Sequence, residues 1–328
     1  MLRIKLTTCF PDWPLARQTP GCSRVWNGCR FFIDDPSADD CDLWAVYGGL
    51  PAIETASCPE GGTLLITSEP AAVHEFLPAF VSQFDSVITS QARLRHPRRL
   101  LTQQAFPWHA GIGRDEQNRI NHDYDSIARI DTLSKPRLLS VVCSDKKMVP
   151  AHRQRLRFVE ILRDHFGDRI DVFGRGHHPI NDKWDAIAPY RYHIALENDR
   201  TPHFWTEKLA DAYLGLAHPI YFGCPNIEDY FPRDAWTAID IFQPKAAIET
   251  ITSLLYQDDY ANRLPALRES RQLVLDRYNV FAVLAEHCHA LAAWNGSRQQ
   301  VTLRPEGHGS WFGRAQRRVG NWLRDRAA

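Results

Sequence analysis

The run from Tyr192 to Lys208 constrains the fold more than any other part of this sequence. Its first seven residues, Tyr192-His-Ile-Ala-Leu-Glu-Asn198, predict a short buried strand that ends on two polar side chains. A loop follows, and Thr206-Glu-Lys208 predicts the start of a helix. A strand end and a helix start that meet at the carboxyl edge of an α/β sheet form the usual crevice for a nucleotide, because backbone N–H groups and the helix dipole there favour an anion. The run therefore predicts an α/β fold with an anion site.

Strand-like runs alternate with helical runs on both sides of Lys135-Pro136. The predicted strands cover residues 2–8, 42–47, 63–68, 85–89, 138–143, 170–174 and 192–198, and the predicted helices cover residues 71–83 and 153–166 and the whole of 244–294. Strands that are separated by helices imply parallel sheets. We therefore predict two Rossmann-like domains, over residues 1–135 and 136–295, that face a central cleft. A basic tail over residues 296–328 follows them.

Composition narrows the class of protein. A chain of 328 residues suits two domains, and 39 basic residues balance 39 acidic ones, so no overall field favours nucleic acid as a partner. No apolar run is long enough to span a bilayer, and the chain starts without a signal peptide. The eight cysteines are scattered without a Cys-x-x-Cys pair, which argues against structural zinc and is typical of reduced thiols in a cytoplasm. We expect a cytoplasmic protein.

The tail has a pattern of its own. Its apolar residues share one helical face and are Trp311, Phe312, Ala315, Val319, Trp322 and Leu323. Arginines cover much of the rest, and a basic amphipathic helix with tryptophans suits peripheral contact with an anionic membrane, here the inner face of the cytoplasmic membrane. A terminal helix that docks on the protein's own core would show the same pattern, so both interpretations stay open.

The strand and helix of the opening run belong to a longer pattern. Its matching groups are Leu196-Glu197-Asn198, Thr206-Glu207-Lys208, Ala212-Tyr213, Pro219-Ile220-Tyr221-Phe222-Gly223 and Pro225, followed by Tyr230-Phe231-Pro232 and Ile239-Asp240-Ile241-Phe242. Over about residues 136–245 this pattern closely resembles the donor-binding signature of the α-1,3/4-fucosyltransferases, family ten of the glycosyltransferases, and a match of this length is far more specific than a single glycine motif. The membrane helix of the animal members is not seen, so the chain looks like a bacterial-type member.

The resemblance implies a GT-B fold and an inverting enzyme that transfers L-fucose from GDP-fucose to a glycan hydroxyl in an α-1,3/4 linkage. It implies that Lys208 contacts the donor diphosphate, that Glu207 accepts hydrogen bonds from the ribose, and that Asn198 and Phe204 also contact the donor. The family commonly has tyrosine where this chain has Phe204, so a phenol hydroxyl is lost there. Glu197 is expected to orient these groups, and Thr206 is expected to cap the helix.

Arg155 is the second predicted cation for the diphosphate. The resemblance places it three residues before Phe158 and seven before Leu162. Its planar guanidinium can bind phosphate oxygens at two points. Arg153 and Arg157 lie two residues away on either side, so a shift in register is an open alternative.

Glu69 is the candidate catalytic base. It follows the predicted strand at 63–68 and precedes Pro70, and the family has a catalytic glutamate in a comparable setting. A glutamate at a helix start beside proline is also an ordinary structural feature, so this alternative stays open. His109 and His74 are the next candidates for the base.

Metal is not expected in the site. The sequence has no Asp-x-Asp motif at a suitable strand end, and cationic side chains with helix dipoles can replace a divalent metal at a leaving diphosphate. The predicted partners are therefore a nucleotide-sugar donor and an oligosaccharide acceptor, with no cofactor. Two other functions stay open, namely transfer from a different nucleotide sugar and glycan binding without catalysis.

Overall fold

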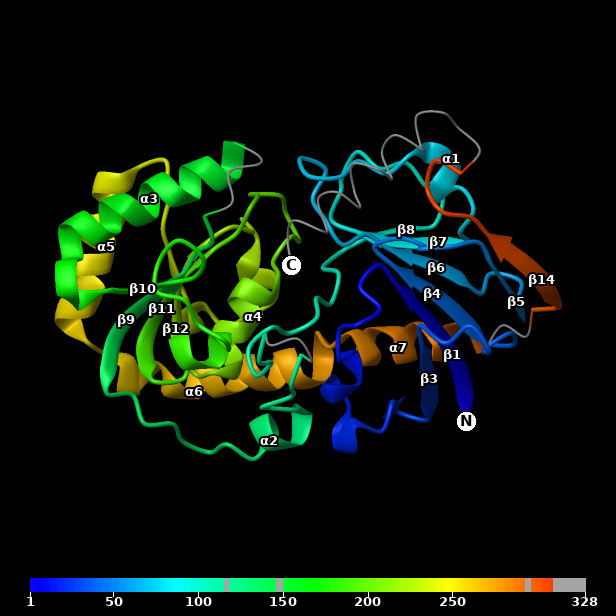
Figure 1. Cartoon of the computed structure of the whole chain (residues 1–328), viewed down its shortest axis with the longest axis horizontal. Coiled ribbons are helices and arrows are strands. Elements are labelled where there is room, and N and C mark those ends of the chain that lie inside the picture. Colours follow the sequence, from blue (N-terminus) through cyan, green and yellow to red (C-terminus); the bar gives the residue numbers. More distant parts are fainter. Residues whose placement is uncertain (115–117, 146–149, 293–295, 309–328) are drawn as a thin grey trace. The chain divides into compact units, whose positions relative to one another are not determined.

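The computed structural model describes residues 1–114, 118–145, 150–292 and 296–308. The chain divides into two compact units, each built on a mostly parallel sheet (Figure 1). Unit 1 holds residues 1–11, 24–104 and those from 284 on, and unit 2 holds residues 12–23 and 105–283. This division differs from the predicted boundary at residues 135 and 136. The buried guanidinium of Arg17 explains part of the difference, since it donates to the carbonyl oxygens of Trp108, Ala110 and His122 and so ties residues 12–23 to the segment after 104.

In the described residues of unit 1, seven strands form a sheet in the order β2-β3-β1-β4-β6-β7-β8. The strands are β1 (Leu2–Thr8), β2 (Val25–Trp26), β3 (Cys29–Ile33), β4 (Leu43–Tyr47), β6 (Thr63–Ile66), β7 (Ser86–Thr89) and β8 (Arg99–Leu101). β2 pairs antiparallel with β3, and the other pairs are parallel. Every residue of β4, β6 and β7 is buried, as expected for central strands that are covered on both faces. These strands confirm the predictions at 2–8, 42–47, 63–68 and 85–89.

The predicted helix over residues 71–83 is wrong. Only α1 (Pro78–Val81) is helical in this segment. Pro78 lacks an N–H, and a proline disfavours helical geometry in the residue before it. Leu77 is accordingly extended, with φ −64° and ψ 134°, so the helix cannot begin before Pro78.

The end of the described chain returns to unit 1. β14 (Arg298–Leu303) pairs antiparallel with β5 (Glu54–Pro59), so the first part of the predicted tail is a strand of this unit. Within unit 1, the end of α7 (Val280–Ala292) lies close to the main sheet, since His287 contacts Ser86 and His289 contacts the Asn27 carbonyl oxygen. The helix predicted from Trp311 on lies outside the described residues.

In the described residues of unit 2, five strands form a wholly parallel sheet in the order β10-β9-β11-β12-β13. The strands are β9 (Arg137–Val142), β10 (Asp171–Phe173), β11 (Tyr190–Leu196), β12 (His218–Phe222) and β13 (Thr237–Ala238). β9, β10 and β11 confirm the predicted strands at 138–143, 170–174 and 192–198, although β11 ends two residues earlier, at Leu196. Because β11 is central, its carboxyl end lies between those of β9 and β12.

Helices cover both faces of this sheet (Figure 1). One face carries α3 (Pro150–Phe166) and α5 (Pro244–Gln257), and the other carries α4 (Glu207–Leu214) and α6 (Tyr260–Gln272). Phe158 and Leu162 of α3 pack on Ile194 in one core cluster, whereas Leu209 and Tyr213 of α4 belong to the other. The predicted helix at 153–166 is confirmed, whereas the region predicted as helical throughout 244–294 is divided into α5, α6, a π-helical turn (Leu273–Arg277) and α7, with breaks after α5 and after the π-helical turn. The unit also contains α2 (Tyr124–Ala128) and several short 3₁₀ helices.

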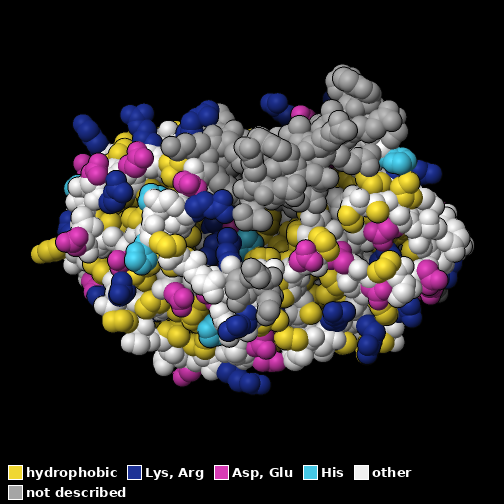
Figure 2. Space-filling model, in the orientation of Figure 1, with side chains coloured by type: hydrophobic (Ala, Val, Ile, Leu, Met, Phe, Trp, Pro, Cys, Tyr) yellow, Lys and Arg dark blue, Asp and Glu magenta, His cyan; other side chains and the backbone are white. Residues whose placement is uncertain are grey.

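Basic and acidic side chains are interspersed over the face shown in Figure 2. This distribution agrees with the formal net charge of +0. Within the described ranges, every helix is too short or too polar to cross a membrane.

Candidate functional site

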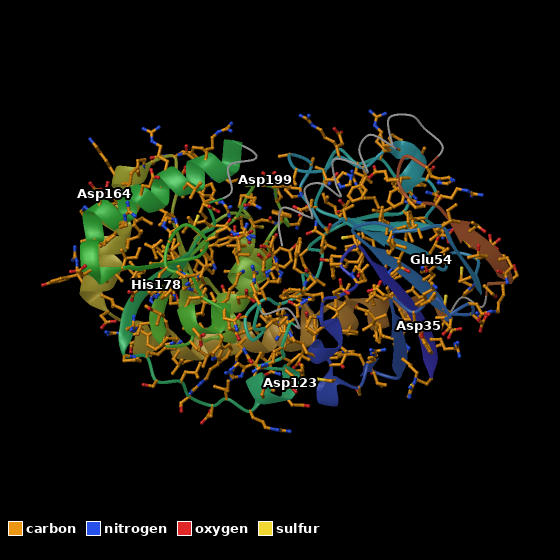
Figure 3. All side chains as sticks on the ribbon, viewed as in Figure 1. Asp35, Glu54, Asp123, Asp164, His178 and Asp199 are labelled. Atoms are coloured by element: carbon orange, nitrogen blue, oxygen red, sulfur yellow. The ribbon has the colours of Figure 1, made fainter. Side chains whose placement is uncertain are left out.

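The carboxyl end of β11 and the start of α4 bring most of the predicted donor-binding residues together in unit 2. β11 ends at Leu196, and Glu197 and Asn198 follow it directly. Figure 3 labels Asp199, the next residue on this loop. Thr206 is the N-cap of α4, and Glu207 and Lys208 occupy its first turn, as predicted. The strand end and the helix start therefore meet as the sequence pattern predicts.

Glu197 joins the two elements. It is fully buried, and both of its carboxylate oxygens accept hydrogen bonds from Thr206, Oε1 from the backbone N–H at 2.7 Å and Oε2 from the hydroxyl at 2.8 Å. Gly223 makes room for it, since a Cβ at that position would lie 2.5 Å from Glu197 Cγ. Burial raises the pKa of Glu197, although the charge of Lys208 opposes this shift. Glu197 thus orients the N-cap of α4, and its role in orienting donor-binding groups stays a prediction.

Lys208 is surrounded by acceptors. Its Nζ lies 3.0 Å from Thr206 Oγ1, 3.0 Å from Glu207 Oε1 and 3.6 Å from Glu197 Oε2. Burial and the nearby charge of Arg155 both act to lower the pKa of Lys208, but the two carboxylates outweigh them and the pKa is raised. The ammonium therefore stays charged at neutral pH.

Glu207 has two cationic neighbours. Besides Lys208, Lys183 Nζ lies 3.6 Å from Glu207 Oε1, and His109 Nδ1 lies 3.8 Å from the same oxygen. Burial alone would raise the pKa of Glu207, but the ammonium of Lys208 dominates and the pKa lies well below its usual value. Glu207 is therefore a carboxylate at neutral pH and can accept hydrogen bonds from hydroxyl groups of a ligand.

Arg155 of α3 reaches the same strand end. Its side chain is buried, and Nη1 donates to the carbonyl oxygen of Leu196 at 3.2 Å. In the described part of the chain, its Nε is buried and has no hydrogen-bond partner. Arg153 and Arg157 are both exposed. The structure thus places Arg155, rather than its two neighbours, beside Glu197 and Lys208.

Asn198 and Phe204 have different environments. Asn198 Oδ1 is buried and, within the described ranges, lacks a hydrogen-bond partner. This oxygen is therefore an unpaired hydrogen-bond acceptor at the strand end. Phe204 is 1% exposed and packs edge-on against Phe106, with ring centroids 5.7 Å apart. Phe204 therefore supports the loop from inside the core, and its contact with a donor stays a prediction.

Glu69 lies in unit 1, at the carboxyl side of β6, on a partly buried turn. The carboxamide of Gln91 donates to the carbonyl oxygens of Glu69 and His74, at 2.9 Å each, and so fastens both ends of this turn. Gln91 is itself 3% exposed. The turn is therefore held in one conformation, whereas the role of Glu69 as a base stays a prediction.

The two alternative histidines lie in different units: His74 shares the Gln91 clamp with Glu69 in unit 1, and His109 lies in unit 2. His74 Nε2 contacts Glu306 Oε2 at 2.7 Å in unit 1. His109 belongs to unit 2, where its ring packs on Trp13 with centroids 4.7 Å apart. Burial lowers the pKa of His109 well below its usual value, so its imidazole is neutral at physiological pH.

Lys183 and Asp211 are site residues that the sequence interpretation missed. Lys183 Nζ lies 3.4 Å from Asp211 Oδ2, and Asp211 Oδ1 accepts from the backbone N–H of His109 at 2.9 Å. The sequence did contain a signal for Asp211: it is an acidic residue within the run from Leu209 to Leu214, all of which is buried in α4, and a buried carboxylate needs a partner. Lys183 had none, since it lies in a short 3₁₀ helix (Lys183–Ala186) without a recognisable spacing.

Over the described residues, no group of three or more His, Cys, Asp or Glu side chains could hold a metal ion. Independence from metal stays a prediction, and the cations at the strand end of β11 are the groups that would carry the charge instead.

Comparison with known proteins places this site in a family. Residues 133–302, more than half of the chain, match the model of glycosyltransferase family 10 (fucosyltransferase), C-terminal part. The human 4-galactosyl-N-acetylglucosaminide 3-alpha-L-fucosyltransferase FUT6 is 29% identical over 164 residues, which cover 48% of this chain and 43% of the relative. The chimpanzee (Pan troglodytes) 3-galactosyl-N-acetylglucosaminide 4-alpha-L-fucosyltransferase FUT3 is 28% identical over 185 residues, or 55% of this chain and 46% of the relative. The matches span less than half the length of these two relatives.

The fold has a solved counterpart as well. A crystal structure of an alpha1,3-fucosyltransferase with GDP-fucose aligns with a TM-score of 0.51 and 16% identity, covering 89% of both chains. Together with the two Rossmann-like units, this likeness confirms the predicted GT-B fold class. With the strand-end signature assembled in unit 2 and the family model matched across it, the chain belongs to glycosyltransferase family 10, the fucosyltransferases.

Proposed function

We propose that this chain transfers L-fucose from GDP-fucose to a hydroxyl of an acceptor glycan, with inversion at the anomeric carbon. The observation that carries the proposal is the pairing of Arg155 and Lys208 at the carboxyl end of β11. Two cations beside the start of a helix suit a diphosphate that gains charge as it leaves. Membership of family 10 supports fucose as the transferred sugar.

On the donor side, Arg155 and Lys208 would bind the two phosphate groups of GDP. Glu207, kept ionised by its cationic neighbours, would accept hydrogen bonds from the ribose hydroxyls. The buried Oδ1 of Asn198 would accept a further hydrogen bond from the donor. These contacts bind the leaving group, so they stabilise the charge that develops in the transition state.

On the acceptor side, Glu69 would remove the proton of the attacking hydroxyl as a general base. The acceptor oxygen then forms a bond to the anomeric carbon of fucose while the bond to the β-phosphate oxygen breaks. GDP leaves with the electron pair, and the β-linked donor becomes an α-fucoside. The names of the two animal relatives support a galactosyl-N-acetylglucosaminide acceptor and transfer to its 3- or 4-hydroxyl.

Incubation with GDP-fucose and a panel of lactosamine-type glycans, read by mass spectrometry, tests the proposal. We expect GDP release and a product heavier by one fucose. Glu69→Gln should lower the rate by about 10² to 10⁴, the usual contribution of a general base, while GDP affinity measured by calorimetry is retained. The exposed Glu75 on the same segment provides a matched control, because Glu75→Gln makes the same chemical change outside the proposed site.

The two alternative functions are distinct outcomes of this experiment. If GDP-fucose gives no product but another nucleotide sugar does, the donor assignment is wrong and the anion site is right. If glycans bind and no donor is turned over, and Glu69→Gln binds them equally well, the chain is a binding protein. We also propose that transfer needs no divalent metal, because Arg155 and Lys208 supply the positive charge.

A further inference from the structure

A row of alternating charges runs along the start of α4 in unit 2. In order it contains Glu197, Lys208, Glu207, Lys183 and Asp211, and each neighbouring pair is 3.0 to 3.6 Å apart. Glu207 and Asp211 are four residues apart on α4 and therefore share one face of the helix. Lys183 comes from the short 3₁₀ helix before β11 and bridges these two carboxylates. The row thus links the residues of the proposed phosphate site to a lysine that no sequence motif marks.

Lys208 is fully engaged within the protein. An ammonium has three N–H groups, and Thr206 Oγ1, Glu207 Oε1 and Glu197 Oε2 all lie within 3.6 Å of its nitrogen. Binding of a diphosphate to Lys208 must therefore replace at least one of these contacts. Of these three partners, we single out Glu207, because it has a second cation beside it. Nζ of Lys183 lies 3.6 Å from Glu207 Oε1, the same oxygen that contacts Lys208.

Lys183 can remain the cation beside Glu207 because it also keeps its ion pair with Asp211. Asp211 is nearly fully buried, and its Oδ2 lies 3.4 Å from Lys183, while its Oδ1 is held by the backbone N–H of His109. A small polar cavity of about 20 Å³ is lined by Lys183, Lys208 and Asp211, so both lysines face a common space large enough for one water molecule. His109 does not compete as a cation, since burial keeps its imidazole neutral.

From this arrangement we infer that Lys183 is a positioning residue of the donor site, which remains the counter-ion of Glu207 when Lys208 turns towards the phosphates of a nucleoside diphosphate. The inference rests on the proposed function, because it requires Lys208 to bind the diphosphate. It assigns to Lys183 an indirect role in affinity. Without Lys183, Glu207 would hold Lys208 more tightly and the phosphates would have to displace a stronger ion pair.

Calorimetric titration of the full chain with GDP tests the inference. We expect Lys183→Met to weaken GDP binding about tenfold, the equivalent of ~1.4 kcal/mol, and Lys183→Arg to restore most of the loss because it keeps the charge. The exposed Lys245 of α5 lies in the same unit, so Lys245→Met controls for the change in net charge and should bind GDP like the wild type. A folded Lys183→Met variant with wild-type GDP affinity overturns the inference.

The pH dependence of GDP binding separates positioning from a merely structural role. The charged groups that face Glu207 are Lys208 and Lys183, with Glu197 and Asp211 beyond them; His109, which lies 3.8 Å away, is kept neutral by burial. In the wild type Glu207 stays ionised down to about pH 5, so a change in GDP affinity over this range reports protonation of the phosphate itself and is shared by the variant. In Lys183→Met the carboxylate has lost one cation and is protonated more readily as the pH is lowered, which releases Lys208, so the loss of GDP affinity relative to the wild type should shrink. Equal pH profiles would contradict the inference.

A second variant applies if Lys183→Met does not fold. Asp211→Asn keeps an acceptor for the His109 N–H and removes the other carboxylate that Lys183 serves, so Lys183 should pair more fully with Glu207. We expect GDP affinity to be retained or increased, whereas a purely structural Lys183–Asp211 bridge predicts a loss.

Lys208→Met tests the proposed function itself. If the wild type does not bind GDP, or Lys208→Met binds it as well as the wild type, the proposed function fails; if only Lys183→Met has no effect, the positioning role alone fails.

Discussion

Thr206 donates two hydrogen bonds to one buried carboxylate, from its backbone N–H to Oε1 of Glu197 and from its hydroxyl to Oε2. This relationship joins the last strand residues to the first turn of α4. The same hydroxyl accepts from Lys208 Nζ at 3.0 Å, so the threonine also holds the cation of the proposed phosphate site. A structural cap and a ligand-binding lysine are thus parts of one network.

Removing the Thr206 hydroxyl should therefore affect both stability and ligand binding. Thr206→Val leaves one oxygen of the buried Glu197 without its donor, which should cost about 1–3 kcal/mol of unfolding free energy. GDP affinity should fall as well, because the start of α4, which carries Lys208, is no longer fixed to Glu197 through this hydroxyl. Chemical denaturation and calorimetry measure the two effects, and Thr206→Ser should restore both. A Thr206→Val variant as stable as the wild type would show that Glu197 finds another donor.

Which arginine of α3 binds the phosphate can be tested directly. Arg155→Met should weaken GDP binding by about tenfold or more, since a charge-assisted contact to a phosphate is lost. The exposed neighbours Arg153 and Arg157 serve as controls on the same helix, and their substitution by methionine should change GDP affinity little. A large effect at Arg153 in place of Arg155 would mean that the phosphate is bound by a different face of α3.

Gln91 offers a test of the turn that carries Glu69. Gln91→Leu removes the carboxamide that bridges the carbonyl oxygens of Glu69 and His74, so the turn should loosen and the free energy of unfolding should fall by about 1–3 kcal/mol. We expect kcat for fucose transfer to decrease while GDP affinity in unit 2 is retained. Gln243→Leu, at an exposed position, is the control. An unchanged kcat in a folded Gln91→Leu variant would separate this turn from catalysis.

Burial of His193 should make stability depend on pH. Its Nδ1 donates to Ser140 Oγ, which itself donates to the Ala186 carbonyl oxygen, and burial lowers the pKa of His193 from 6.5 to about 3. Between these two values the unfolded chain binds the proton more readily than the folded chain, so stability falls as the pH decreases, by at most about 1.4 kcal/mol per pH unit. His193→Asn keeps the hydrogen bond to Ser140 and should show a shallower decline in thermal unfolding experiments. His178→Asn, at the exposed histidine labelled in Figure 3, should follow the wild type.

Removal of divalent metal should leave transfer intact. Excess EDTA is expected to change the initial rate by less than about twofold, because two side-chain cations rather than a metal would offset the charge of the leaving diphosphate. The matched measurement adds Mg²⁺ to the same assay. Loss of activity with EDTA that Mg²⁺ restores would mean that the diphosphate needs a metal in addition to Arg155 and Lys208.

Local patterns were enough to locate most elements of unit 2 and the central residues of its site. β11 and the start of α4 were predictable because a buried strand shows as an apolar run and a helix start shows as a threonine cap followed by polar residues. Arg155 was predicted from the family resemblance through its spacing to Phe158 and Leu162, and these two residues lie in the core beneath α3. The helix predicted over 71–83 does not form before Pro78, because this proline disfavours helical geometry in the residue that precedes it.

The rest depended on contacts between residues that are distant in the chain. The placement of residues 12–23 in unit 2 follows from three carbonyl oxygens, 91 to 105 residues away, that accept from Arg17. Lys183 reaches Asp211 across 28 residues and Glu207 across a similar interval, and no periodic pattern in the sequence encodes such a distance. Side-chain type and spacing therefore sufficed for the local elements and for the expectation of an anion site. The counter-ions, and with them the protonation states, were decided by packing, because electrostatic interactions depend on distance in space and on burial rather than on order in the chain.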